Sequence, residues 1–266
     1  MRFAIAVHGG AGSHSENSER NVNKVLKRAC LEASDILKNK GGSVLDAVEA
    51  AIKVLENDEA FNAGYGSNLN TDHQVECDAS IMDSRGSFGA VGAIKGLRNP
   101  ISGARAVLEG SRPGRKSILG RVPPLLVCGD GAVTYVTRDV SKDLKTLLGP
   151  PEKVPIDSLI SPRADREWRY WTERYRVANN ENPTEEDKSS ALDTVGATII
   201  CENGEAASGV SSGGLLLKFP GRIGEVFVWR EYYRPLFNVE IRLQSTGLVV
   251  GRPASILREE ESTASR

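Results

Sequence analysis

Runs of apolar residues divide the first part of the chain into predicted strands and helices. Residues 3–7 form a short apolar run that ends in a glycine-rich turn, which predicts a buried strand. Between residues 21 and 38 apolar side chains recur every three or four positions, which predicts an amphipathic helix. Ser43 and Asp46 have the spacing of a capping box. They predict that a second helix begins there and continues to Leu55.

The middle of the chain predicts more strands. Residues 75–82 and 87–94 read as the two strands of a hairpin, because turn-forming residues separate them. A proline after an asparagine predicts a short helix over residues 99–108. Residues 124–128 and 132–137 predict a second pair of strands.

Beyond residue 140 the pattern changes. Residues 140–148 predict a helix, and a polar stretch over 179–192 predicts a flexible linker. Residues 194–201 are β-branched and apolar, Asn203-Gly204 is a strong turn signal, and 206–211 return as a second strand. Thr194 is therefore expected to open a hairpin directly after the linker.

Composition and charge exclude several functions. The 266 residues carry 34 basic and 35 acidic side chains, so no net field favours nucleic acid or a membrane surface. The four cysteines have no C-x-x-C spacing, which argues against a zinc site or a disulfide framework, and we expect no cofactor or metal. No apolar run has the length of a signal peptide or a membrane span, which predicts a cytoplasmic or nuclear protein.

The bond between Asp193 and Thr194 is the feature of the sequence that most clearly suggests a catalytic residue. If the chain were cut there, Thr194 would become an N-terminal residue. A free α-amino group has a pKa of about 7.7–8.0, so it could act as the general base for the hydroxyl of the same residue. One threonine would then supply both nucleophile and base.

Two other motifs point to different chemistry. Residues 209–213 fit the G-x-S-x-G nucleophile elbow, and residues 8–12 resemble the oxyanion segment of serine esterases. That mechanism needs a histidine after the serine, whereas His8, His14 and His73 all precede it. The chain also lacks a P-loop and a complete G-x-G-x-x-G motif, so nucleotide binding is not expected.

Six blocks follow one another in a recognisable order. They are H-G-G-A-G at 8–12, N-A-G-Y-G-S-N-L-N at 62–70, E-C-D-A-S-I-M-D at 76–83, D-T-V-G-A at 193–197, S-S-G-G at 211–214 and G-R-I-G-E at 221–225. Together they resemble the N-terminal-nucleophile family of plant-type asparaginases, isoaspartyl peptidases and glycosylasparaginases. The block at 76–83, the segment 120–132, the Ser-Ser pair and Asp193 are most similar to its threonine aspartase (taspase) branch.

The resemblance implies a fold and a maturation step. The fold class is α+β, a four-layer αββα sandwich, incomplete at the C-terminus because the resemblance ends after residue 225. Residues 1–266 would form one domain. The hydroxyl of Thr194 would attack the carbonyl of Asp193, an N-to-O acyl shift would give an ester, and water would release the amine. The products, an α subunit (1–193) and a shortened β subunit (194–266), would stay associated and pair as αβ units.

The resemblance also implies a set of site residues. Thr194 would be the catalytic nucleophile, Ser212 the second hydroxyl that hydrogen-bonds to it, and Asn62 a neighbour of both. Taken alone, Ser212 and Asn62 are ordinary turn formers, and Arg222 is a solvated charge. In the family an arginine at that place holds a substrate carboxylate, to which its two-pronged guanidinium is suited. The residues implied in substrate binding are Arg222, Gly224 and Glu225.

Three functions remain open on the sequence. Because the chain would cut its own bond after Asp193, the main expectation is a threonine endopeptidase that cuts protein substrates after aspartate, at sites like Asp-Gly. An isoaspartyl peptidase or L-asparaginase that acts on small β-aspartyl substrates is the first alternative. The family's oxyanion-hole turn lies beyond Glu225 and is not recognisable here, and one lost oxyanion donor costs roughly 10²–10³ in rate. A catalytically inactive truncated isoform is therefore the second alternative.

Overall fold

One seven-stranded sheet is the framework of the part of the chain that the structure describes. This computed structural model describes residues 2–10, 16–112, 118–140, 144, 146–178, 194–224 and 254–258. The strand order is β4-β3-β2-β6-β5-β1-β7, with β3 and β4 parallel and the other neighbours antiparallel. The strands are β1 (Phe3–His8), β2 (Cys77–Asp83), β3 (Phe88–Ile94), β4 (Leu126–Cys128), β5 (Val195–Cys201), β6 (Ala206–Ser212) and β7 (Ala254–Arg258).

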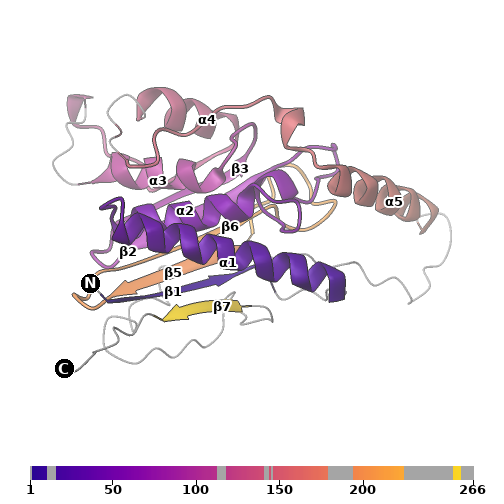
Figure 1. The fold of residues 1–266 in the computed structure, drawn as a ribbon. Coiled ribbons are helices and arrows are strands. Elements are labelled where there is room, and N and C mark those ends of the chain that lie inside the picture. Colours follow the sequence, from indigo (N-terminus) through magenta and orange to yellow (C-terminus); the bar gives the residue numbers. More distant parts are fainter. Residues whose placement is uncertain are drawn as a thin grey trace.

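Helices cover one face of this sheet (Figure 1). The helix α1 (Glu16–Lys38) packs on β1 and β7, α2 (Val44–Glu56) on β5 and β6, and α3 (Pro100–Ser111) on β2 and β3. The short α4 (Gly129–Thr134) packs on β3, and α5 (Pro162–Ala178) projects from the edge of the molecule. The mixed α+β class expected for the family is confirmed, and the described residues contain one of its sheets with its helical layer.

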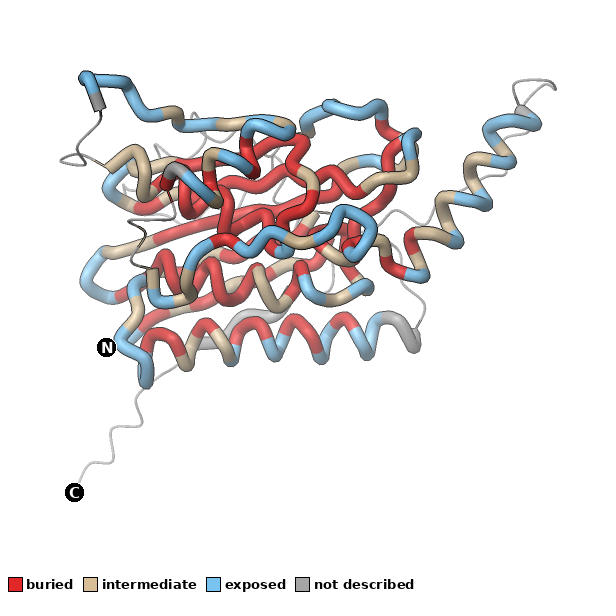
Figure 2. Tube along the Cα trace, turned by 90° about the horizontal axis from the view of Figure 1, so that it is seen from above, coloured by how far each residue is buried: buried red, intermediate tan, exposed pale blue. Residues whose placement is uncertain are grey.

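The alternation of side chains along the strands explains this layering. In β1, Phe3, Ile5 and Val7 are buried, while the residues between them are half-buried. Gly209 of β6 lies directly under α2, because a Cβ there would come within 2.9 Å of the Ile52 side chain. Figure 2 shows the buried residues concentrated along the sheet and on its helical side, with exposed residues on the outer side of α1.

Several sequence predictions agree with the structure. The two predicted hairpins are β2–β3 and β5–β6, and the Asn203-Gly204 turn joins the second pair. The capping box is present, since the Ser43 hydroxyl accepts from the Asp46 amide while the Asp46 carboxylate accepts from the Ser43 amide. Local turn and capping chemistry thus determines these elements.

Two predictions around residue 140 are wrong. The predicted strand 132–137 is helical, because α4 continues into a π-helical turn over Tyr135–Asp139 that buries Val133 and Val136 against the core. Packing against β3 outweighs the strand preference of these β-branched residues. The predicted helix 140–148 is also absent among its described residues, where Thr146 and Gly149 form a turn instead.

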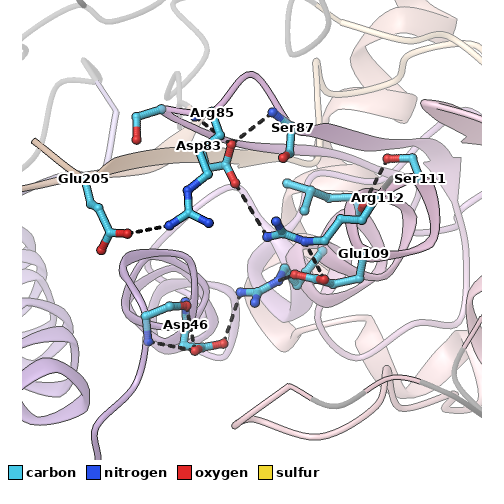
Figure 3. A network of polar contacts seen from close by, with 12 residues as sticks. Asp46, Asp83, Arg85, Ser87, Glu109, Ser111, Arg112 and Glu205 are labelled. Atoms are coloured by element: carbon cyan, nitrogen blue, oxygen red, sulfur yellow. Dashed lines mark hydrogen bonds and ion pairs between the residues drawn. The ribbon is translucent and has the colours of Figure 1, made fainter. Parts of the chain in front are cut away.

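The end of the sheet away from Thr194 is held by charged side chains (Figure 3). Asp83, at the end of β2, accepts from the amides of Arg85 and Ser87, and the Arg85 guanidinium pairs with Glu205 at 2.6 Å. Arg112, just after α3, lies 3.5 Å from the Asp83 carboxylate. Asp83, Arg85, Arg112 and Glu205 line a small pocket of about 80 Å³ at the N-terminus of α2.

Candidate active site

Two hydroxyl groups meet at the open end of the β5–β6 hairpin. Val195 lies opposite Ser211 in this antiparallel pair, so the residue before β5 lies opposite the last residue of β6. The Thr194 hydroxyl donates to the Ser212 hydroxyl over 3.0 Å. Ser212 is buried and Thr194 half-buried. The register of the hairpin therefore brings together two residues that the sequence analysis selected.

Asn62 holds the turn that follows Ser212. Its side-chain amide donates to the carbonyl oxygen of Gly214 over 2.8 Å. The backbone carbonyl oxygen of Asn62 accepts from the Gly213 amide over 2.8 Å. The Gly214 amide in turn donates to the Ser212 hydroxyl over 3.1 Å. A side chain at position 213 would come within 2.5 Å of the Asn62 amide oxygen, so glycine is required there. Asn62 thus fixes the backbone beside the hydroxyl pair.

Two carboxylates anchor the segment that carries Arg222. Glu76 accepts from the Gly221 amide over 2.8 Å, and Asp78 of β2 accepts from the Gly224 amide over 2.8 Å. Arg222 lies between these two anchored glycines and is exposed.

Asp78 connects this segment to the hydroxyl pair. It lies opposite Ser212 in the β2–β6 register and has no exposed surface. Its second carboxylate oxygen accepts from the amide of Ala93 over 2.8 Å. Sequence reasoning assigned no role to Asp78, although two carboxylates, Glu76 and Asp78, inside the apolar run 75–82 were the available signal.

The two remaining predicted site residues, Asp193 and Glu225, lie outside the described residues, as does the predicted linker 179–192. Their roles, the division into subunits 1–193 and 194–266, and the pairing of αβ units stay predictions. Among the described residues, no cluster of histidine, cysteine or acidic side chains is arranged to hold a metal ion. None of the helices there is long and apolar enough to cross a membrane.

The cysteines are poor candidates for a nucleophile. Burial raises the pKa of Cys30 and of Cys77 to about 11. The pKa values of Cys128 and Cys201 are also raised, chiefly by desolvation. Because a thiolate is the reactive form, these thiols stay protonated and inert near neutral pH.

The G-x-S-x-G motif is not a nucleophile elbow. Ser211 lies inside β6, opposite Val195, and its side chain is fully buried. An elbow needs a sharp turn between a strand and a helix that exposes the serine. A hydroxyl nucleophile in this part of the molecule is therefore better placed at Thr194.

Comparison with known proteins decides the family. The family model described as asparaginase matches residues 1–114 and 137–228. The chain belongs to the asparaginase family of N-terminal-nucleophile hydrolases. The match includes β1 and β6, and it covers Thr194, Ser212 and Asn62.

Relatives in this asparaginase family are similar over most of the chain. The isoaspartyl peptidase/L-asparaginase of Xenopus laevis is 37% identical over 226 residues, which are 85% of this chain and 64% of that protein. The protein of the same name from Mus musculus is 37% identical over 85% of this chain and 61% of its own length. The Homo sapiens protein of the same name is 35% identical over 85% of this chain and 65% of its own length. The chain thus spans less than two thirds of the length of these relatives.

These relatives correct the expectation of a threonine aspartase that cuts proteins after aspartate. They carry the name isoaspartyl peptidase/L-asparaginase, so that expectation is wrong on this finding. Of the features that favoured it, residues 76–83 and 120–132 include the strands β2 and β4, the Ser-Ser pair ends β6, and Asp193 lies outside the described residues. These features of the strands and of the hydroxyl pair therefore do not by themselves report which substrate a site accepts.

Proposed function

We propose that this chain is the precursor of a threonine-dependent hydrolase of β-aspartyl bonds, an isoaspartyl peptidase/L-asparaginase. The observation that carries the proposal is the hydrogen bond of 3.0 Å between Thr194 and Ser212 at the start of β5. The family supplies the N-terminal-nucleophile chemistry. The printed names of the relatives supply the substrate class.

The first step would be self-cleavage at the Asp193–Thr194 bond. The Thr194 hydroxyl oxygen bonds to the carbonyl carbon of Asp193, and the C–N bond breaks as the nitrogen takes up the hydroxyl proton. Water then hydrolyses the ester and leaves a carboxylate on Asp193 and a free α-amine on Thr194. The χ1 angle of a β-branched residue is restricted, which helps to direct the hydroxyl.

The same hydroxyl would then act on substrate. The new α-amine takes the hydroxyl proton as general base, and the oxygen attacks the side-chain carbonyl of a β-aspartyl group. Ammonia or the amine of a peptide leaves, and water releases aspartate from the ester. Arg222, exposed between two anchored glycines, would bind the α-carboxylate of the substrate by its guanidinium.

An assay of released aspartate tests this proposal. The purified chain is incubated with a β-aspartyl dipeptide, with L-asparagine and with an α-linked Asp-Gly peptide. We expect turnover of the first two substrates, and none for any substrate with Thr194→Ala. The matched control is Thr198→Ala, which removes another threonine of the hairpin whose hydroxyl also pairs with a serine.

Each unfavourable result has a clear meaning. An inert wild-type chain, or a Thr194→Ala variant as active as the wild type, contradicts the proposed nucleophile. Cleavage of the α-linked peptide alone contradicts the proposed substrate class.

A further inference from the structure

The first turn of α5 is bound to the loop that carries Asn62. The Arg163 guanidinium donates from Nε to the carbonyl oxygen of Glu59 over 2.8 Å and from a terminal nitrogen to that of Gly66. Its other terminal nitrogen pairs with Glu167 at 2.7 Å. Only 17% of the Arg163 side chain is exposed. One side chain therefore joins the two ends of loop 59–66.

This loop is folded tightly on itself. A Cβ on Gly66 would lie 2.0 Å from the carbonyl oxygen of Phe61, so the two backbone strands of the loop are in direct contact. The Phe61 ring is fully buried and occupies the space that a side chain on Gly9 would need. Arg163 adds a planar donor with two prongs across the ends of this loop, which a lysine cannot reproduce.

A continuous series of hydrogen bonds runs from this loop to the candidate nucleophile. Asn62 binds the Gly214 carbonyl oxygen, the Gly214 amide binds the Ser212 hydroxyl, and that hydroxyl accepts from Thr194. The Asn62 amide oxygen also accepts from the Asn68 amide over 2.9 Å. A displacement of Asn62 would therefore move the backbone beside Ser212.

Two further contacts hold α5 in place independently of Arg163. The Trp168 indole donates to the carbonyl oxygen of Asn70 over 2.8 Å, and His73 contacts Asp165 at 2.8 Å. The rings of His73 and Trp168 also meet edge to face, with centroids 4.5 Å apart. A change at Arg163 alone should leave the helix docked, and this makes Arg163 testable without unfolding α5.

We propose that Arg163 is a positioning residue, which sets the place of Asn62 and, through it, of the Ser212–Thr194 pair. In this arrangement the helix that precedes the predicted linker is coupled to the site. The effect on turnover rests on the proposed function, whereas the effect on the hydrogen bonds of Asn62 does not.

Hydrogen exchange of the full chain, followed by mass spectrometry, tests the structural part. Arg163→Lys keeps the charge but loses the two-pronged contact, and Arg166→Lys changes an exposed arginine on the same helix. We expect the amides of Asn68 and Gly213, both bound to Asn62, to exchange roughly 10-fold faster in Arg163→Lys. They should be unchanged in Arg166→Lys. Unchanged exchange at these amides in Arg163→Lys, or equal acceleration in peptides of β1 and α3, overturns the inference.

Turnover of a β-aspartyl dipeptide tests the catalytic part. We expect kcat of Arg163→Lys to fall roughly 10-fold with KM within about 2-fold of wild type, because the Arg222 segment is not touched. A wild-type kcat in Arg163→Lys overturns the positioning role. If the wild-type chain itself is inert, the proposed function fails, and the exchange of Asn68 and Gly213 still decides the role of Arg163.

Discussion

The β5–β6 hairpin contains two threonine–serine pairs that are chemically alike but differ in their surroundings. Thr194 donates to Ser212 over 3.0 Å, and Thr198 contacts Ser208 over 2.7 Å. Side chains alternate along a strand, so both pairs lie on the same face of the sheet. The two pairs form an internal comparison.

The two pairs differ in their position along the hydrogen-bonded strands β5 and β6. The Ser208 hydroxyl also donates to the carbonyl oxygen of Ala197, and paired residues flank it on both sides. Ser212 ends its strand, and a glycine turn held by Asn62 follows it. Hydroxyl pairing is common to both threonines. What distinguishes Thr194 is its position at the end of a strand, where a carbonyl group can approach its hydroxyl.

Removal of each serine hydroxyl should have the largest differential effect. Ser212→Ala is expected to lower kcat on a β-aspartyl dipeptide by about 10²-fold, similar to the loss of one oxyanion donor. Ser208→Ala should leave kcat within about 2-fold, because it removes a hydroxyl inside the ladder. Equal losses in steady-state assays of the two variants would break the comparison.

Asn62 should matter through the turn that it holds. Asn62→Ala leaves the Asn68 amide without this partner, which costs about 1–3 kcal/mol, and leaves the Gly214 carbonyl oxygen bound to the Asn68 side chain alone. We expect a lower denaturant midpoint and a loss of about 10-fold or more in kcat. Asn39→Ala, at an exposed asparagine on the end of α1, is the control and should change neither. A fully active Asn62→Ala protein would show that the turn is not needed.

A buried carboxyl behind the site should make stability depend on pH. Desolvation raises the pKa of Glu56 to about 7, and its carboxylate accepts from the Ile101 amide. An unfolded glutamate has a pKa of about 4.3, so between these values the folded state binds more protons and stability falls as pH rises. In Glu56→Gln, the decrease in the free energy of unfolding between pH 5 and 8 should be smaller than in the wild type by about 1–3 kcal/mol, since one pKa unit equals about 1.4 kcal/mol.

Chemical denaturation at several pH values measures the Glu56 effect. Glu59→Gln, at an exposed carboxylate in the following turn, serves as the matched control and should keep the wild-type dependence. Parallel curves for Glu56→Gln and wild type would show that the buried carboxyl does not titrate in this range.

The charged end of the sheet should show the smallest effect. The Arg85–Glu205 pair has side chains that are 69% and 42% exposed, and such pairs contribute about 0–1 kcal/mol. Arg85→Ala should therefore shift the free energy of unfolding by less than about 1 kcal/mol and leave turnover unchanged. A large loss of activity would mean that this end communicates with Thr194.

Local sequence signals predicted the hairpin that carries Thr194, whereas the role of Ser212 was implied only by the family resemblance. Asn203-Gly204 and the β-branched run after Thr194 fix the turn and register, and the register places Thr194 beside Ser212. The family resemblance added Asn62, which lies 152 residues from its partner Gly214. No local pattern predicts such a contact.

The parts that sequence reasoning missed depend on distant backbone partners. Asp78 accepts from an amide 146 residues away, and Arg163 binds carbonyl groups about 100 residues away. A charged residue of this kind resembles a solvated one until the fold brings its partner near. The helical turn around Val136 was missed for a related reason, since tertiary packing outweighed local preference.

The mass of the purified chain shows whether Thr194 cuts the bond that precedes it. We predict that the wild-type chain and Thr198→Ala each separate into two polypeptides, the second of which begins at Thr194, while Thr194→Ala stays whole. A wild-type chain that remains a single 28.7 kDa polypeptide after prolonged incubation, or one cut at another bond, would contradict it.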